Sequence, residues 1–198
     1  MAVTIEDIKK LKELTGVGLT DAKHALVEAD GDFDKALEAM RKKGLTKAEK
    51  KGDRETREGL IESYVHSNRI GVVVEVNCET DFVARLPEFK EFAHQIAMQI
   101  AAMNPAYATM DDIPADVLTA KKEELLTSEG LKSKPEAMRE QIVDGQLKKH
   151  FAEQVLTEQP FVLDDGKTVG QLIKEQIAKS GENVRVSQFK RIELGVTE

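Results

Sequence analysis

The sequence predicts an α+β fold, in which an N-terminal three-helix domain precedes a core of a small antiparallel sheet packed with helices. Three observations support this prediction. Helical spacing of apolar residues runs through positions 4–40, a charged stretch follows, and the spacing then changes to that of paired strands. The predicted boundaries are residues 1–52 for the helical domain, 53–58 for a charged linker and 59–198 for the α+β core.

The N-terminal domain is predicted to contain three amphipathic helices. Thr4 is a suitable N-cap for the first helix, which Gly16 and Gly18 are expected to end. We expect Thr20 to cap the second helix, Asp32 to cap the third, and Gly44 to end the third. The apolar positions at helical spacing are Ile5, Ile8, Leu11 and Leu14 in the first helix, Ala22, Ala25, Leu26 and Ala29 in the second, and Phe33, Ala36, Leu37 and Met40 in the third.

The core is predicted to begin with a β-hairpin. Residues 60–66 and 70–77 are rich in β-branched side chains and flank a polar three-residue turn, Ser67-Asn68-Arg69. The second of these strands is apolar at nearly every position, so we expect it to lie in the centre of the sheet. Residues 184–194 are predicted to form the last strand, which returns to the same sheet.

Helices are expected between these strands. One is opened by Pro87, one covers about residues 114–129, one covers about residues 135–156, and one is capped by Thr168. Residues 160–166 are expected to form a loop and a turn, because proline, aspartate and glycine are concentrated there.

Composition excludes several classes of protein. The chain has 29 lysines and arginines against 36 aspartates and glutamates, a net charge of −7, so we expect no broad nucleic-acid interface. Its single cysteine excludes an internal disulfide framework and multi-cysteine zinc sites. No apolar run approaches the ~18 residues of a membrane span, and the charged N-terminus does not resemble a signal or transit peptide. A cytoplasmic protein without membrane association is expected.

Charge is unevenly distributed along the chain. Residues 41–58 carry 8 basic and 4 acidic side chains, whereas the segments before and after them are net acidic. The default interpretation of such a stretch is a hydrated connector. The alternative is a small basic contact for an acidic protein partner.

Three motif-like patterns fail their chemical requirements. Gly166-Lys167-Thr168 lacks the earlier glycine of a phosphate-binding loop, and Asp30, Asp32 and Asp34 lack the glycine and final acid of a calcium loop. The four histidines show no ligand spacing, and Cys78 ends an apolar strand, where a packed thiol is usual. We therefore expect no catalytic residue, no metal site and no cofactor, and a protein that is not an enzyme.

The junction after the apolar strand stands out, because Asp81 and Phe82 follow it before the next long helix begins. Such junctions are usually at the surface. Phe82 is therefore either a core residue that folds back, which is the default interpretation, or an apolar anchor held out for a partner.

Residues 75–85 have the sequence EVNCETDFVAR. This segment closely resembles the signature of the elongation factor Ts family. Members of that family are the guanine-nucleotide exchange factors of elongation factor Tu. Residues 15–23, TGVGLTDAK, resemble the other signature of that family. Residues 47–51, KAEKK, and residues 159–162, QPFV, are also similar to the family. The resemblance extends over essentially the whole chain.

The resemblance implies that residues 1–52 form a ubiquitin-associated-like domain, which docks on the nucleotide-binding domain of elongation factor Tu. It also implies that Thr80, Asp81, Phe82 and Val83 bind that partner. Phe82 would insert beside the nucleotide and displace the elements that hold Mg²⁺ and phosphate, and Asp81 would hold polar groups at this junction.

Lys23 in the N-terminal domain and Lys51, just before the charged linker, match further family contact positions, and His66 is a weaker match. The partner would be bound both with GDP and without nucleotide, and no cofactor is implied for the chain itself. The alternative function is an adaptor, whose three-helix domain binds other small folded proteins without any effect on nucleotides.

Many members of the family have two core modules and a long helical hairpin. This chain has room for one module only, and no hairpin insertion is evident in its sequence. The resemblance implies that short members pair, so we expect a homodimer, in which Asp81 and Phe82 act from one subunit and His66 from the other.

Overall fold

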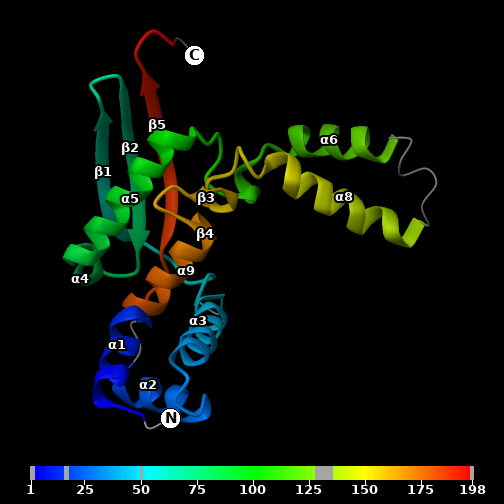
Figure 1. Cartoon of the computed structure of the whole chain (residues 1–198). Coiled ribbons are helices and arrows are strands. Elements are labelled where there is room, and N and C mark those ends of the chain that lie inside the picture. Colours follow the sequence, from blue (N-terminus) through cyan, green and yellow to red (C-terminus); the bar gives the residue numbers. More distant parts are fainter. Residues whose placement is uncertain (1–2, 16–17, 50, 128–135, 197–198) are drawn as a thin grey trace.

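The computed structural model describes residues 3–15, 18–49, 51–127 and 136–196, and it confirms the predicted α+β fold (Figure 1). The helices are α1 (Ile5–Thr15), α2 (Leu19–Glu28), α3 (Phe33–Glu49), α4 (Asp81–Ala84), α5 (Pro87–Met103), α6 (Ala115–Thr127), α8 (Glu136–Phe151) and α9 (Val169–Ser180). The strands are β1 (Glu58–His66), β2 (Ile70–Cys78), β3 (Pro160–Phe161), β4 (Asp164–Thr168) and β5 (Arg185–Glu193). Two short 3-10 turns, η1 (Met110–Asp112) and η2 (Leu156–Glu158), complete the described elements.

Helices α1, α2 and α3 pack around a small core of their own, at the foot of the molecule in Figure 1. Alanines lie among the leucines and the methionine of this core, and their small side chains let the helices approach closely. The buried residues are Leu11, Ala22, Ala25, Leu26, Ala36 and Met40. The predicted apolar stripes therefore supply this core, and α3 also packs against α9 of the following module.

Two of the predicted caps in this unit are confirmed. The Thr4 hydroxyl accepts a hydrogen bond from the Asp7 backbone N–H at 3.0 Å, and the Asp32 carboxylate accepts one from the Lys35 N–H at 3.1 Å. The prediction for Thr20 is wrong, because α2 begins two residues earlier, at Leu19, and Gly18 is its N-cap. Glycine is itself a good N-cap, so the backbone could start the helix there.

The predicted end of α3 at Gly44 is also wrong, since the helix continues to Glu49. A glycine inside a helix costs only about 1 kcal/mol, and the lysine and alanine that follow favour helix. The helix ends predicted at Gly16 and Gly130, and the helix start predicted at 135, lie outside the described residues.

The main sheet has the order β1-β2-β5, with both pairs antiparallel, so β2 is the central strand as predicted. The β1–β2 connection turns tightly because Ser67 and Asn68 both adopt positive φ, +49° and +56°. Two consecutive residues of this kind match the right-handed twist of paired strands. The hairpin turn and helix α4 consequently lie at opposite ends of the sheet (Figure 1).

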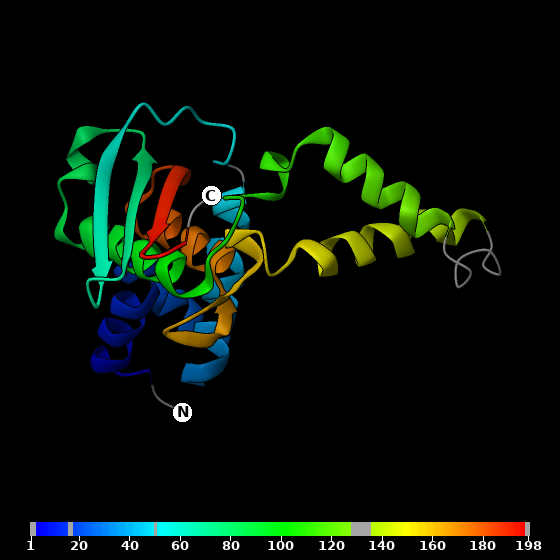
Figure 2. The same ribbon diagram turned by 90° about the horizontal axis from the view of Figure 1, so that it is seen from above.

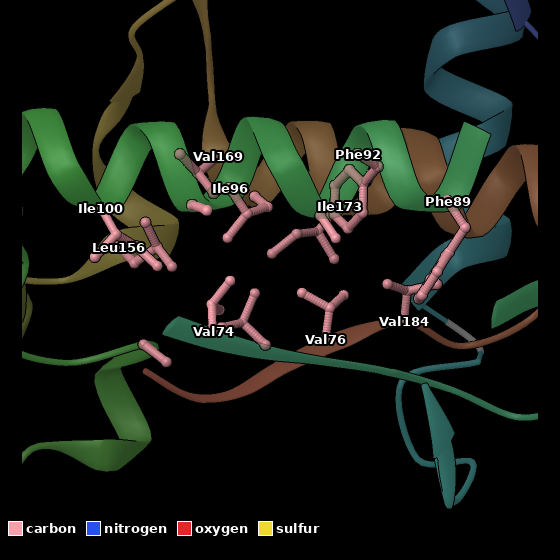
Figure 3. Close-up of a cluster of buried hydrophobic side chains, with 14 of the residues drawn as sticks. Val74, Val76, Phe89, Phe92, Ile96, Ile100, Leu156, Val169, Ile173 and Val184 are labelled. Atoms are coloured by element: carbon pink, nitrogen blue, oxygen red, sulfur yellow. The ribbon is translucent and has the colours of Figure 1, made fainter. Parts of the chain in front are cut away.

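One face of the sheet is covered by α5 and α9, and the main core lies beneath them (Figure 3). Alternate residues of β2, including Val74 and Val76, point toward the apolar side of α5, which carries Phe89, Phe92 and Ile96. Gln99 of α5 also bonds to the β3–β4 segment, since its amide donates to the Pro160 carbonyl and its side-chain oxygen accepts from the Val162 N–H. This arrangement fixes α5 and, at its N-terminal end, the short helix α4 that precedes it.

Helices α6 and α8 form an antiparallel hairpin that projects away from the sheet (Figures 1 and 2). The expectation that no such hairpin is present is therefore wrong. Both helices are polar over most of their surface, and α6 contains no fully buried residue. Their sequences resemble those of ordinary surface helices. Only the tertiary structure shows that they pack on each other and project away from the sheet. The base of the hairpin has its own apolar cluster, made of Ile113, Val143, Leu147, Phe151 and Val155.

Two further boundaries differ from the prediction. Helix α8 ends at Phe151 rather than near residue 156, because Leu156 leaves the helix to pack in the main core. Residues 160–168 form the small β3–β4 hairpin, not a loop with a turn at Asp164-Asp165-Gly166. Among the described residues, no helix is both long and apolar enough to cross a membrane.

Candidate partner-binding site

Phe82 is held in the solvent by a short helix whose other residues are anchored. Val83 and Ala84 of α4 are buried in the main core, whereas 78% of Phe82 is exposed. Consecutive residues of a helix point about 100° apart, so burial of Val83 and Ala84 directs Phe82 away from the core. The default interpretation of Phe82 as a core residue is therefore wrong, and the ring is an exposed apolar side chain in a defined position.

The start of α4 is fixed by a carboxylate that comes from the far end of the chain. Glu182 accepts hydrogen bonds from the backbone N–H groups of Glu79 and Thr80, at 3.1 and 3.0 Å. The hydroxyl of Thr80, the N-cap residue, donates to the other oxygen of Glu182 at 2.7 Å. The Thr80 side chain therefore accepts no capping hydrogen bond from the helix backbone. Instead, the Glu182 carboxylate accepts hydrogen bonds from the backbone N–H groups that precede the first turn.

The same junction is tied to the linker. The buried residue Asn183 donates its backbone N–H to the Glu79 carboxylate at 2.6 Å, and its side-chain amide donates to the carbonyls of Gly52 and Arg54. Sequence analysis missed Glu182 and Asn183, because more than a hundred positions separate them from Glu79 and Thr80, and no local pattern marks them. Glu182 and Asn183 reach this junction because they directly follow the end of α9.

Asp81 lies at the first position of α4 and forms an ion pair with Arg85, at 2.8 Å between a guanidinium nitrogen and a carboxylate oxygen. Both side chains are exposed, so the pair contributes little to stability. The pair links two residues of the turn that carries Phe82.

The two lysines from the sequence prediction lie in different settings. Lys23 is exposed on α2 within the three-helix unit. Lys51 is partly buried, and its ammonium donates to the carbonyl of Gly181 at the C-terminal end of α9, at 2.5 Å. This bond joins the linker to the residues that hold α4, so Lys51 has a structural contact of its own.

His66 is not brought near Phe82 within one chain. It ends β1 and pairs with Ile70, whereas α4 follows the opposite end of β2. The eight steps of β2 between Ile70 and Cys78 correspond to about 26 Å at ~3.3 Å per residue. The Tyr64 hydroxyl contacts the Nδ1 atom of His66 at 2.9 Å and so orients the ring. Sequence reasoning missed Tyr64, although it lies two positions away on the same face of the strand.

Cys78 is fully buried at the end of β2, and its thiol donates to the Thr80 carbonyl at 3.1 Å. Burial, reinforced by the negative charge of Glu182, raises the pKa of this thiol from 9.0 to about 11. A nucleophilic cysteine needs a lowered pKa and access to substrate, so the environment of Cys78 is the opposite of a catalytic one. Within the described residues, no group of three or more His, Cys, Asp or Glu side chains could hold a metal ion.

The raised pKa of Cys78 predicts a loss of stability in alkaline solution. The unfolded thiol ionises near pH 9 whereas the folded thiol keeps its proton until about pH 11, so the free energy of unfolding falls as the pH rises between these values. Urea unfolding of the chain and of Cys78→Ala at pH 8 and pH 10.5 measures this. The loss should be smaller in the variant, and an equal loss in both would contradict the assignment to Cys78.

Comparison with known proteins gives a consistent result along the whole chain. The family model described as "Elongation factor TS" matches residues 6–196. Proteins named elongation factor Ts from Thermotoga petrophila and Thermotoga maritima are each 53% identical to this chain over 196 residues, which is 98% of both chains. The protein of the same name from Thermodesulfovibrio yellowstonii is 47% identical over 198 residues, with 100% of this chain and 99% of the relative covered. These relatives therefore have essentially the same length as this chain.

Proposed function

Because this chain belongs to the elongation factor Ts family, we propose that it acts in translation elongation by promoting the release of GDP from elongation factor Tu. The proposed partner is bound both with GDP and in its nucleotide-free form. The chain needs no cofactor of its own for this function, and its place of action is the cytoplasm, where elongation proceeds. Thr80, Asp81 and Phe82 are proposed as the residues at the nucleotide side of the contact, whereas Val83, which is buried in the main core, supports them from within the chain.

The observation that carries this proposal is the exposure of Phe82 on an anchored helix. Apolar rings that protrude in a defined frame are typical anchors of protein interfaces, where they fill a pocket of the partner. Because α4 is fixed on the core by Val83 and at its start by Glu182, little conformational freedom remains to be lost when the ring inserts. Lys23 on α2 and the rest of the three-helix unit are proposed to dock on the nucleotide-binding domain of the partner.

Exchange requires no covalent chemistry from the chain. It is sufficient that the chain binds nucleotide-free partner more tightly than nucleotide-bound partner. Insertion of Phe82 beside the nucleotide site would displace groups that hold Mg²⁺ and phosphate, and so weaken the grip on GDP. Since the coupling is reciprocal, binding of a new nucleotide expels the chain by the same free energy.

The proposal is tested by following a fluorescent GDP analogue bound to elongation factor Tu after addition of unlabelled GDP. The rate of release should rise with the concentration of the intact chain. No acceleration at any concentration would overturn the proposal. Binding without acceleration, measured in parallel by titration, would instead identify an adaptor.

We further propose that two copies pair through the open face of the sheet. One face of β1-β2-β5 is covered by α5 and α9, whereas apolar side chains on the other face remain exposed. Val65, Gly71 and Ile192 lie opposite one another across the three strands, and Val65 and Ile192 are 63% and 73% exposed. Large apolar side chains exposed together on one face of a sheet commonly mark an interface. Pairing would also let His66 of one subunit and Phe82 of the other act on one partner.

A charge placed in this face should separate the two subunits. We expect light scattering to give twice the 22.0 kDa chain mass for the unchanged protein and 22.0 kDa for Ile192→Lys. Burying an unpaired ammonium in an apolar contact is strongly unfavourable. Leu163→Lys, at an exposed apolar position in the β3–β4 turn, is the matched control and should leave the mass unchanged. A monomeric unchanged chain would contradict the proposed dimer.

A further inference from the structure

We propose that Glu182 is a positioning residue for Phe82, and that its carboxylate, which has no contact with the ring itself, decides how the ring is presented. The effect on nucleotide exchange rests on the function proposed above, whereas the effect on the ring does not. Glu182 follows Gly181 at the end of α9 and is partly buried against the start of α4.

Helix α4 is too short to hold its own shape. It has four residues, and the backbone bonds of its single turn run from Ala84 to Thr80 and from Arg85 to Asp81, at 3.3 and 3.2 Å. A first helical turn is unfavourable alone, because several backbone dihedrals must be fixed for one or two hydrogen bonds. Contacts from outside the helix must therefore stabilise it.

Two such contacts are present, at opposite parts of the helix. Val83 and Ala84 pack in the main core, which restrains the end of the turn. At its beginning, Glu182 receives three hydrogen bonds, two from the N–H groups of Glu79 and Thr80 and one from the Thr80 hydroxyl. Hydrogen bonds to an ionised carboxylate are stronger than neutral ones. Phe82 lies between these two points, so both are needed to fix its direction.

The residues on either side of Glu182 are themselves held in place. Gly181 adopts a left-handed conformation, with φ of +77°, which ends α9 and turns the chain toward α4. The Gly181 carbonyl accepts from Lys51, and Asn183, the residue after Glu182, is buried and donates to the carbonyls of Gly52 and Arg54. The same three residues, 181–183, therefore link the Phe82 helix to the segment that leads to the three-helix unit. Glu182 is the member of this group that contacts α4 directly.

The positioning is tested first without any partner. The chain contains no tryptophan, so Phe82→Trp introduces a single emitting ring at the site. In this background Glu182→Ala should lower the fluorescence anisotropy of the tryptophan, and hydrogen exchange at the amides of Glu79 and Thr80 should become faster. Glu175→Ala, which removes a partly buried glutamate of α9 that is bonded to Lys167, is the control and should change neither. Unchanged anisotropy and amide exchange in Glu182→Ala would overturn the proposal.

The consequence for exchange is tested by a double-mutant cycle with Phe82→Ala in the full-length chain. Glu182→Ala should reduce the acceleration of GDP release by roughly tenfold or more, an effect typical of losing hydrogen bonds to a charged group. If Glu182 acts through the ring, it should have no further effect once Phe82→Ala is present. An equal loss in both backgrounds would show a role independent of Phe82 and would overturn the proposal.

Glu182→Gln separates positioning from a direct charge contact with the partner. The amide oxygen can still accept from both backbone N–H groups, so this variant should retain most of the activity, and a loss as large as that of Glu182→Ala would contradict positioning. If Glu182→Ala does not fold by circular dichroism, Thr80→Val removes one of the three bonds and is used in the same cycle. If the unchanged chain gives no exchange at all, the proposed function fails, while the anisotropy result still decides the positioning role.

Discussion

Replacement of Phe82 by alanine is expected to remove most of the acceleration of GDP release and to leave the fold intact. An aromatic anchor at the centre of an interface is worth about 2 kcal/mol or more, which corresponds to at least about a 30-fold loss in the efficiency of exchange. Because 78% of the ring is exposed, the free energy of unfolding should change by less than about 0.5 kcal/mol. The first quantity is measured with a fluorescent GDP analogue on elongation factor Tu, the second by urea unfolding.

The control for this experiment is another exposed apolar residue away from α4. Leu163, in the turn between β3 and β4, is 57% exposed, and Leu163→Ala should retain full exchange activity. Exchange by Phe82→Ala at the rate of the unchanged chain would rule out the insertion role. The wider proposal would survive this result only if the unchanged chain still accelerates release.

Replacement of Phe89 by alanine is expected to destabilise the fold, which replacement of Phe82 should leave intact. Phe89 lies seven positions later in the first turn of α5, and it is fully buried between that helix and the sheet (Figure 3). Its ring lies 6.2 Å from that of Phe92, between centroids. Removing a buried phenylalanine leaves a cavity that the surroundings fill only in part, which typically costs about 3–5 kcal/mol.

This loss is a large share of the stability of an ordinary domain, about 5–15 kcal/mol, and should appear as a clear shift of the urea midpoint. Circular dichroism at the helix band measures it, with Phe82→Ala as the matched phenylalanine variant. A decrease below about 1 kcal/mol would mean that the main core does not depend on this ring. Together the two variants separate an aromatic side chain used for binding from one used for packing.

The helices and strands of the α+β fold were largely predictable because their signals are local. The β-branched residues on both sides of a polar turn predicted a hairpin, and the apolar run of β2 predicted a central second strand; the structure confirms both. The Thr4 and Asp32 caps were predictable for the same reason, since a cap is made by residues three positions apart. Boundaries at Thr20 and Gly44 were wrong, because cap and stop preferences of about 1 kcal/mol are easily overridden by neighbouring residues.

The hairpin of α6 and α8 was not predictable from periodicity. A helix that packs on one partner outside the core has the same spacing of apolar residues as a helix on the core surface. The distinction depends on which element its apolar side meets. Here Val143 and Leu147 of α8 meet the base of the hairpin rather than the sheet.

By itself, the sequence determined the α+β class, the central position of β2, the unusual Asp81-Phe82 junction and, through its resemblance to a family, the partner to propose. It could not determine whether Phe82 is buried or exposed, because an aromatic residue at a strand-to-helix junction suits either state. The tertiary structure decided this, since Val83 is drawn into the core and Glu182 holds the start of α4 from more than a hundred positions away. Contacts between such distant segments depend on how the whole chain packs, and no local pattern records them.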